Sequence, residues 1–214
     1  MKKYLIIPFL AVMAFTACRK KENTVSTLVT YSTPTIVVTG AQYYSIPVGG
    51  ALPAIAATAY DSFYKESYPV VIDQSTLDNT APGLYIVNMT SKNKYGMVGT
   101  YGVYIAVTNI NPAINLAGDY FRVSNLQTVS VTKLANGLYQ TDNIGGVIPP
   151  SAAIVPAFFV QTDDSTIVVP VQSSSLGDIY GINAKVHMAV GDTSYQYVVK
   201  NPSFGTATRV FQKI

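Results

Sequence analysis

The fold is decided by a run of alternating side chains, Gly83-Leu84-Tyr85-Ile86-Val87-Asn88-Met89-Thr90, and by the segment that follows it. Even-numbered residues from Leu84 to Thr90 would share one face of a β-strand, and odd-numbered residues from Tyr85 to Met89 would share the other. The next segment, Lys92-Asn93-Lys94-Tyr95-Gly96, has the composition of a hairpin turn, with Gly96 placed for a positive φ. Val98–Val107 then follows as the second strand of the hairpin.

Similar strand-like runs extend in both directions from this hairpin. They are short and divided by Gly, Pro, Asn and Asp, and no stretch after residue 22 repeats apolar residues with a helical period, so we expect no long helix. The other expected strands are Thr35–Thr39, Tyr43–Pro47, Ile55–Tyr60 and Tyr68–Ile72, then Gly118–Ser124, Thr128–Lys133, Gly137–Asp142, Ile154–Gln161, Thr166–Gln172, Ile179–Met188, Ser194–Val199 and Ala207–Gln212.

The composition agrees with an all-β protein. Of 214 residues, 49% are hydrophobic and only 12% are charged, with 16 Tyr and no Trp. The low charge excludes a disordered polyelectrolyte and a charged coiled coil. Five of the 14 basic residues lie in the first 21 positions, which leaves 9 basic and 10 acidic residues from Asn23 onward. The body is therefore close to neutral, and we expect no nucleic-acid partner.

The N-terminus has the pattern of a lipoprotein signal peptide. A charged start precedes the apolar run Tyr4–Phe15, which is too short to span a bilayer as a helix. The run ends in Phe15-Thr16-Ala17-Cys18, which resembles a bacterial lipobox. The resemblance implies a signal peptide over residues 1–17, acylation of Cys18 and a tether over residues 18–33. The alternative is an ordinary secretory signal with an incidental Cys.

The residues after Cys18 bear on localisation. Arg19 stands where an Asp would resemble an inner-membrane retention signal, which favours the outer membrane. The run Arg19-Lys20-Lys21-Glu22 is not the acidic run that some lipoproteins carry for export to the cell surface. We therefore expect an outer-membrane lipoprotein held by its lipid, with surface-facing and periplasm-facing orientations both open.

Two further resemblances concern the body of the chain. Thr80–Val87, Lys94–Gly96 and Val103–Val107 resemble the bacterial Ig-like (cadherin-like) modules of secreted lipoproteins. Gly118–Tyr120, Asn136–Asp142 and Gly145-Gly146 are similar to the lipocalin-like C-terminal domain of two-domain lipoproteins from gut Gram-negative anaerobes. These resemblances imply an Ig-like β-sandwich over residues 34–110 and an antiparallel β-barrel or sandwich meander over residues 115–214. We expect the boundary at Asn109–Pro112, because Pro112 interrupts strand pairing and the polar residues suit a short linker. The resemblances imply no activity.

The sequence offers little material for catalysis. His187 is the only His, and Glu22 and Glu66 are the only Glu residues. Most Asp residues stand in turn contexts, where they bond their own backbone. Asp61, Asp73 and Asp78 are too scattered for the carboxylate cluster of a calcium site. We expect no enzyme, no cofactor and no metal.

One segment is the candidate ligand patch. Residues 60–68 hold four aromatic residues, and we place them in the loop between the second and third strands of the Ig-like module. Aromatic rings could stack on a sugar, and carboxylates could accept its hydroxyl protons. The alternative is that Tyr60 and Tyr68 pack in the core. The candidate residues are Tyr60, Asp61, Phe63, Tyr64, Glu66 and Tyr68.

Two further features concern modification and ligand binding. Asp164-Ser165-Thr166 resembles an acceptor motif for O-glycosylation, with Ser165 as the modified residue. Phe158-Phe159 and Val168-Val169 would line a cavity if the C-terminal domain is a barrel.

The leading hypothesis is a non-catalytic lipid-anchored envelope protein that captures glycan or assists a nutrient-uptake system. The alternatives are a structural or adhesion lipoprotein with a protein partner, and a lipocalin-like carrier of a small apolar ligand.

Overall fold

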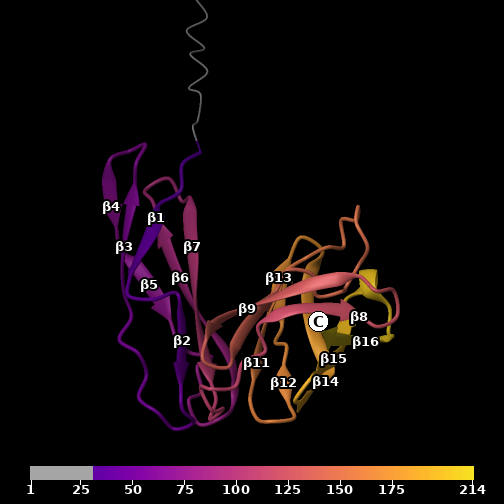
Figure 1. Ribbon diagram of the computed structural model, residues 1–214. Helices are drawn as coiled ribbons and strands as arrows, with labels where there is room; N and C mark the ends of the chain where they lie inside the picture. The colour runs from indigo at the N-terminus through magenta and orange to yellow at the C-terminus, as the bar shows by residue number, and fades with distance from the viewer. Residues whose placement is uncertain (1–30) are drawn as a thin grey trace, which may run out of the picture. The chain divides into compact units, whose positions relative to one another are not determined.

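The computed structural model describes residues 31–214, and the fold comprises Ser32–Ile214 (Figure 1). Within these residues the chain is all-β, as the sequence predicts, with one short 3-10 helix at Pro202–Phe204. Among the described residues, no helix is long and apolar enough to cross a membrane. The expected signal peptide and Cys18 lie outside the described residues.

The first half of the fold consists of two sheets packed face to face. In the three-stranded sheet the order is β1 (Thr35–Thr39), β3 (Ala56–Asp61) and β4 (Glu66–Tyr68). In the four-stranded sheet the order is β2 (Tyr43–Ile46), β7 (Val98–Val107), β6 (Gly83–Lys92) and β5 (Val70–Asp73). Only β2 runs parallel to its neighbour, β7; the other pairs in these two sheets are antiparallel.

The core between these sheets comes from one face of the expected hairpin. Val87 and Met89 of β6 and Ile105 of β7 are buried there against Ile36 of β1 and Ala59 of β3. The turn that joins β6 to β7 is also as expected, with Gly96 at φ 85°. The period-2 pattern therefore sets both the register and the buried face.

The second half is one antiparallel sheet of nine strands. From one end to the other the order is β12 (Ile167–Val168), β11 (Ala157–Gln161), β10 (Leu138–Thr141), β9 (Thr128–Ala135), β8 (Gly118–Arg122), β16 (Thr208–Lys213), β15 (Asp192–Lys200), β14 (Gly177–Ala189) and β13 (Gln172–Ser174). The Asn136-Gly137 turn joins β9 to β10, with Gly137 at φ 69°.

The nine-stranded sheet curls until its two ends meet. Gly181 N donates to Val169 O at 3.0 Å, and Val186 N donates to Ser165 O at 2.9 Å. The enclosed face is filled by the sheet's own side chains, many of them aromatic. Those that are less than 2% exposed include Tyr120, Tyr139, Phe159, Tyr195, Tyr197 and Phe211.

Two expected strands are each broken by a proline. The structure divides Tyr68–Ile72 at Pro69 into β4 and β5, which belong to different sheets. It likewise divides Thr166–Gln172 near Pro170 into β12 and β13, at opposite ends of the curled sheet. Proline has no N–H to donate to a ladder, so the chain leaves one strand there and starts another.

The two halves share a small apolar cluster with hydrogen bonds beside it. Leu84 and Ala106, from the outer face of β6 and β7, pack with Leu138 and Val160 of the nine-stranded sheet. Beside them the Thr108 hydroxyl donates to Gln161 O at 2.7 Å, and Asn136 Nδ2 donates to Ile110 O at 2.9 Å. We call this set the junction. The expected domain boundary at Asn109–Pro112 lies between β7 and β8 and stays a prediction.

Candidate functional site

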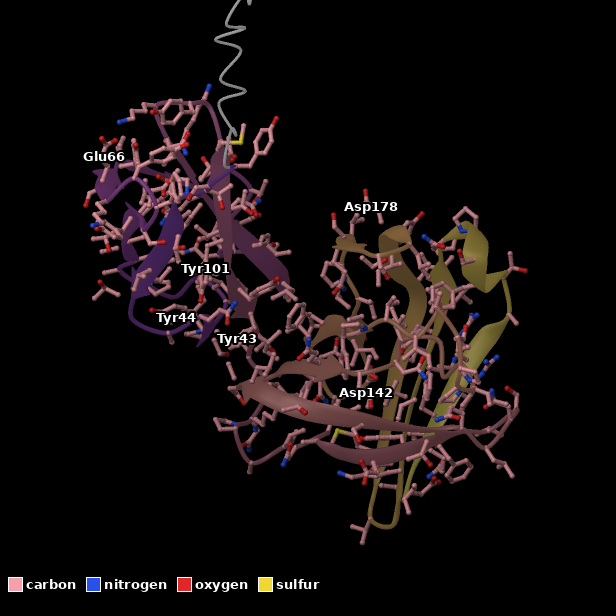
Figure 2. All side chains as sticks on the ribbon, turned by 90° about the horizontal axis from the view of Figure 1, so that it is seen from above. Tyr43, Tyr44, Glu66, Tyr101, Asp142 and Asp178 are labelled. Carbon is pink, nitrogen blue, oxygen red and sulfur yellow. The ribbon has the colours of Figure 1, made fainter. Side chains whose placement is uncertain are left out.

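The candidate ligand patch lies on a tight hairpin. Residues 62–65 connect β3 to β4, so the segment joins the third and fourth strands rather than the second and third. The hairpin places Glu66 near the end of the first half, away from Tyr43 and Tyr101 (Figure 2). Tyr60 points outward on β3 and is 47% exposed, while Tyr68 is half-buried on β4.

Asp61 is buried and holds three chain segments together. Its Oδ1 accepts hydrogen bonds from the Ser32 hydroxyl at 2.7 Å and from two backbone N–H groups of its own turn. Its Oδ2 accepts from Asn93 Nδ2 at 3.1 Å. Burial alone raises the pKa of the Asp61 carboxyl, but these hydrogen bonds outweigh it, and the pKa lies below its ordinary value. The Asp61 carboxylate thus accepts hydrogen bonds from its own chain, and its role in ligand binding stays a prediction.

Glu66 is also engaged. Its carboxylate accepts from Lys94 Nζ at 2.6 Å and from the Tyr68 hydroxyl. The hydrogen bond from Lys94, followed by that from Tyr68, holds the pKa of Glu66 below its ordinary value. Both carboxylates that the sequence assigned to sugar recognition therefore already have partners in the chain.

The aromatic residues of the patch form a small exposed cluster. The rings of Phe63 and Tyr64 meet edge to face with centroids 4.9 Å apart, and Tyr64 lies 4.6 Å from Tyr95. Phe63 and Tyr95 are more than half exposed. We call Phe63, Tyr64 and Tyr95 the aromatic tip. Tyr95 was not among the expected site residues, although its place in the turn after the deciding strand would have indicated it.

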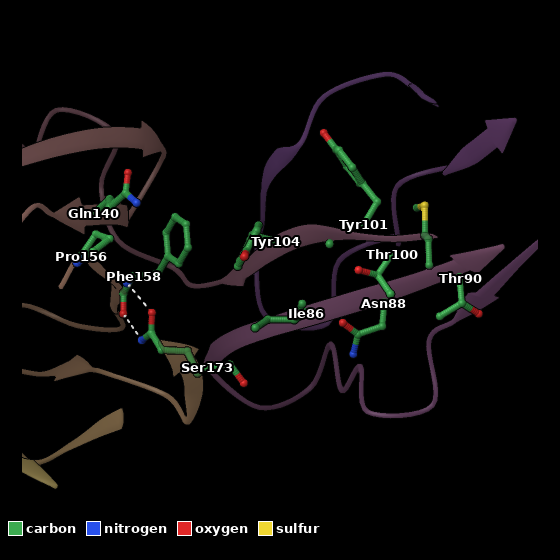
Figure 3. A pocket seen from close by; sticks show the side chains of 13 residues that line it. Ile86, Asn88, Thr90, Thr100, Tyr101, Tyr104, Gln140, Pro156, Phe158 and Ser173 are labelled. Carbon is green, nitrogen blue, oxygen red and sulfur yellow. Dashed lines mark hydrogen bonds between the residues drawn. The ribbon is translucent and has the colours of Figure 1, made fainter. Parts of the chain in front are cut away.

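A second candidate site is a cleft beside the junction. A cleft of about 620 Å³ separates the outer face of β6 and β7 from β10, β11 and β13 (Figure 3). None of its residues was expected as a binding residue of this cleft, and Phe158 was expected to line a cavity inside the C-terminal domain instead. The lining consists of Ile86, Asn88, Met89, Thr90, Thr100, Tyr101, Gly102, Tyr104, Gln140, Pro156, Phe158, Gln172 and Ser173.

Aromatic rings form one end of the cleft. Tyr104 of β7 and Phe158 of β11 lie with ring centroids 4.3 Å apart, and Tyr43 of β2 packs behind Tyr104 at 5.6 Å. Burial, with smaller contributions from Tyr43 and Tyr101, raises the pKa of the Tyr104 hydroxyl. This hydroxyl therefore stays protonated at neutral pH and can donate a hydrogen bond.

Uncharged polar side chains form the rest of the wall. On β6 and β7 the cross-strand pairs Thr90–Thr100 and Asn88–Gly102 share the cleft face, and the missing side chain at Gly102 deepens the hollow. Gln140 faces them from β10. Gln172 is occupied, because its amide bonds the N–H of Phe158 at 2.7 Å and the carbonyl at 2.9 Å (Figure 3). The lining contains no Asp, Glu, Lys, Arg or His.

The remaining expected positions lie apart from both sites. Ser165 is exposed in the turn between β11 and β12, where Asp163 Oδ1 accepts from its N–H at 2.8 Å and its hydroxyl at 3.0 Å. His187 is exposed on β14, 3.7 Å from Asp192. In residues 31–214 no three His, Cys, Asp or Glu side chains gather in a way that could hold a metal ion. Cys18 lies outside the described residues.

No family model matches the sequence, and no curated protein matches it. Among solved structures, the fold is similar to the crystal structure of a lipoprotein from Bacteroides thetaiotaomicron. The two chains are 13% identical, the match covers 84% of this chain and 100% of that one, and the TM-score is 0.38. A likeness of this strength assigns no function.

Proposed function

We propose that the protein is a non-catalytic, lipid-anchored protein of the cell envelope that captures a neutral oligosaccharide in the cleft beside the junction. The observation that carries this proposal is the lining of the cleft, which combines half-buried aromatic rings with amides and hydroxyls and has no charged side chain. Sugars present apolar ring faces and many hydroxyl groups, and such a wall is complementary to both.

The same lining argues against other ligand classes. An anionic ligand such as a nucleotide or a charged sugar would be met by Arg or Lys, and the cleft has neither. A wholly apolar ligand would leave the polar groups of Asn88, Thr90, Thr100 and Gln140 without partners. A neutral, hydroxyl-rich ligand satisfies them.

The non-catalytic part of the proposal rests on the position of the acidic groups. Glycoside hydrolysis uses two facing carboxylates, and none lies in the cleft. Within the described residues Glu66 is the single Glu, and it is paired with Lys94 at the aromatic tip. Tyr104 could hold a substrate hydroxyl but has no carboxylate or imidazole beside it in the lining to exchange protons with.

The anchor is proposed from the sequence. An acylated Cys18 would hold the protein on the outer membrane, with either orientation open. The lipocalin-like alternative has less support, because the enclosed face of the curled sheet is filled by its own aromatic side chains. A structural or adhesion role would use the same anchor and fold without the cleft.

Titration calorimetry with neutral and charged oligosaccharides tests the capture function. Gly102→Leu should abolish binding, because the new side chain fills the cleft while its Cβ meets only ordinary contacts, at 3.5 Å or more. Thr58→Leu, an exposed change on β3, is the matched control and should bind normally. A saturating ligand at a hundred times its Kd should stabilise the fold by about 2.7 kcal/mol.

The outcomes separate the competing hypotheses. Binding that survives Gly102→Leu and is lost with Tyr64→Ala would move the site to the aromatic tip. A thermal shift with small lipids alone would favour the carrier. No binding by any sugar in the panel would refute glycan capture for that panel and leave the structural role. Loss of the lipid mass in Cys18→Ser checks the anchor independently.

A further inference from the structure

The aromatic tip lies outside the proposed sugar-binding cleft and combines exposed aromatic rings with lysines. Phe63 is 56% exposed and Tyr95 is 57% exposed, and together with Tyr64 they form an apolar cluster on the turns of two hairpins. Lys94 Nζ lies 5.7 Å from the ring centre of Tyr64 and 5.5 Å from that of Tyr95. Lys65 and Lys92 are exposed on the same two hairpins. The acidic groups near these three lysines are Glu66, which is partly exposed, and Asp61, which is buried.

The first residue of the fold lies at the same end as the aromatic tip. Ser32, the first residue of the fold, is bonded through its hydroxyl to Asp61 on one hairpin, and its carbonyl accepts from Asn93 Nδ2 on the other at 2.8 Å. The fold therefore begins at Ser32, between the two hairpins that carry the tip. Thirteen residues lie between Cys18 and Ser32, so a fully extended chain limits the distance between these two residues to about 50 Å.

Given the lipid anchor at Cys18 on which this inference rests, we propose that the aromatic tip docks on the surface of the bilayer that holds the anchor. Tyrosine and phenylalanine rings partition to the boundary between head groups and acyl chains, where the phenol hydroxyl stays wet. Lysines beside them reach anionic phosphate groups. The tip and the lipid then act as two linked attachments, the second strengthened by the short tether.

The absence of tryptophan from the chain allows a direct test. Lipidated full-length protein is placed in vesicles of phosphatidylethanolamine and phosphatidylglycerol whose acyl chains are either brominated or not. The variant Phe63→Trp carries the only indole at the tip. Val190→Trp, at a fully exposed turn of the nine-stranded sheet, is the matched control. Docking predicts that bromine quenches the indole at position 63 and leaves that at position 190 unchanged.

Charge reversal supplies a second readout. Lys65→Glu combined with Lys92→Glu in the Phe63→Trp background should reduce the quenching, because the tip then repels anionic lipid. Lys185→Glu, an exposed change on β14, should leave the quenching intact.

Unquenched fluorescence at position 63 in protein that still floats with the vesicles would overturn the docking proposal while leaving the anchor in place. Protein that fails to float would overturn the anchor, and the docking proposal with it. Equal quenching at both positions would overturn docking by the tip. A normal melting curve for each variant excludes misfolding as the cause.

Discussion

At the scale of single residues, Asp61 stabilises the end of the fold at which the chain enters. It accepts hydrogen bonds from Ser32, from Asn93 and from its own turn, and these contacts are why its pKa is lowered. A carboxyl with a lowered pKa stabilises the fold above the ordinary pKa of Asp, about 3.9, and loses this contribution as the pH falls through the folded value.

We therefore predict that Asp61→Asn lowers the melting temperature at pH 7, because the amide group turns a donor toward donors. The substitution should also flatten the loss of stability below about pH 4. Circular dichroism melting curves across acid pH measure both effects, and Asp164→Asn, an exposed turn change, is the control. Identical acid profiles for Asp61→Asn and the unsubstituted protein would contradict the assignment.

At the scale of elements, β7 carries a glycine that the chain entering the fold requires. A Cβ at Gly99 would clash with the backbone carbonyl oxygen of Pro34, which lies against this strand just before β1 begins. Gly102, three residues along, has only ordinary contacts around its Cβ position. The two glycines of one strand thus differ in what surrounds them.

Gly99→Ala should destabilise the protein by about 1–3 kcal/mol, because the backbone at Pro34 must move away. Gly102→Ala should be neutral or slightly stabilising, since it removes freedom from the unfolded chain without a clash. Urea unfolding of both variants provides the measurement. Equal midpoints would show that the backbone at Pro34 has room to spare.

Much of the element scale could be predicted from the sequence, because strands and turns are local patterns. The alternation from Leu84 to Met89, Gly96 in its turn and the Asn136-Gly137 hairpin all appear as expected. The breaks at Pro69 and Pro170 were missed, because a change of sheet depends on where partner strands lie. The hydrogen bonds of Asp61 could not be predicted for a related reason: its partners, Ser32 and Asn93, are distant in sequence.

The cleft was missed for a reason that belongs to the larger scale. Tyr104 and Phe158 lie on different sheets, and each alone looks like a strand residue that packs inward. Only the junction brings the outer face of β6 and β7 against the nine-stranded sheet.

At the scale of the whole molecule, the junction should make the two halves unfold together. Leu84 is 8% exposed and packs only in the junction cluster. We predict that Leu84→Ala costs about 2–5 kcal/mol and separates one calorimetric transition into two. Val37→Ala, on the exposed face of β1, should keep a single transition. Two transitions in the unsubstituted protein would refute coupling by the junction.

The tyrosines inside the curled sheet make the whole fold sensitive to alkali. Burial is the main cause that raises the pKa of Tyr120, Tyr139, Tyr195 and Tyr197. Their contribution to stability is complete below the ordinary tyrosine pKa of about 10 and is lost as the pH rises toward the folded values. The part of the tyrosinate absorbance that comes from these four buried residues should therefore rise in step with the loss of the circular dichroism signal of the fold. Full ionisation of all the tyrosines near pH 10 with the fold intact would disprove this.

The hydrogen bonds at Ser32 also have a mechanical consequence. A force applied along the chain from its N-terminal side enters the fold at Ser32, which Asp61 and Asn93 hold to two separate hairpins. The load is therefore divided between the three-stranded and the four-stranded sheet before it reaches the ladder between β1 and β3. In this sense Asp61 is a latch, and the first strand stays shielded from tension for as long as the latch remains closed.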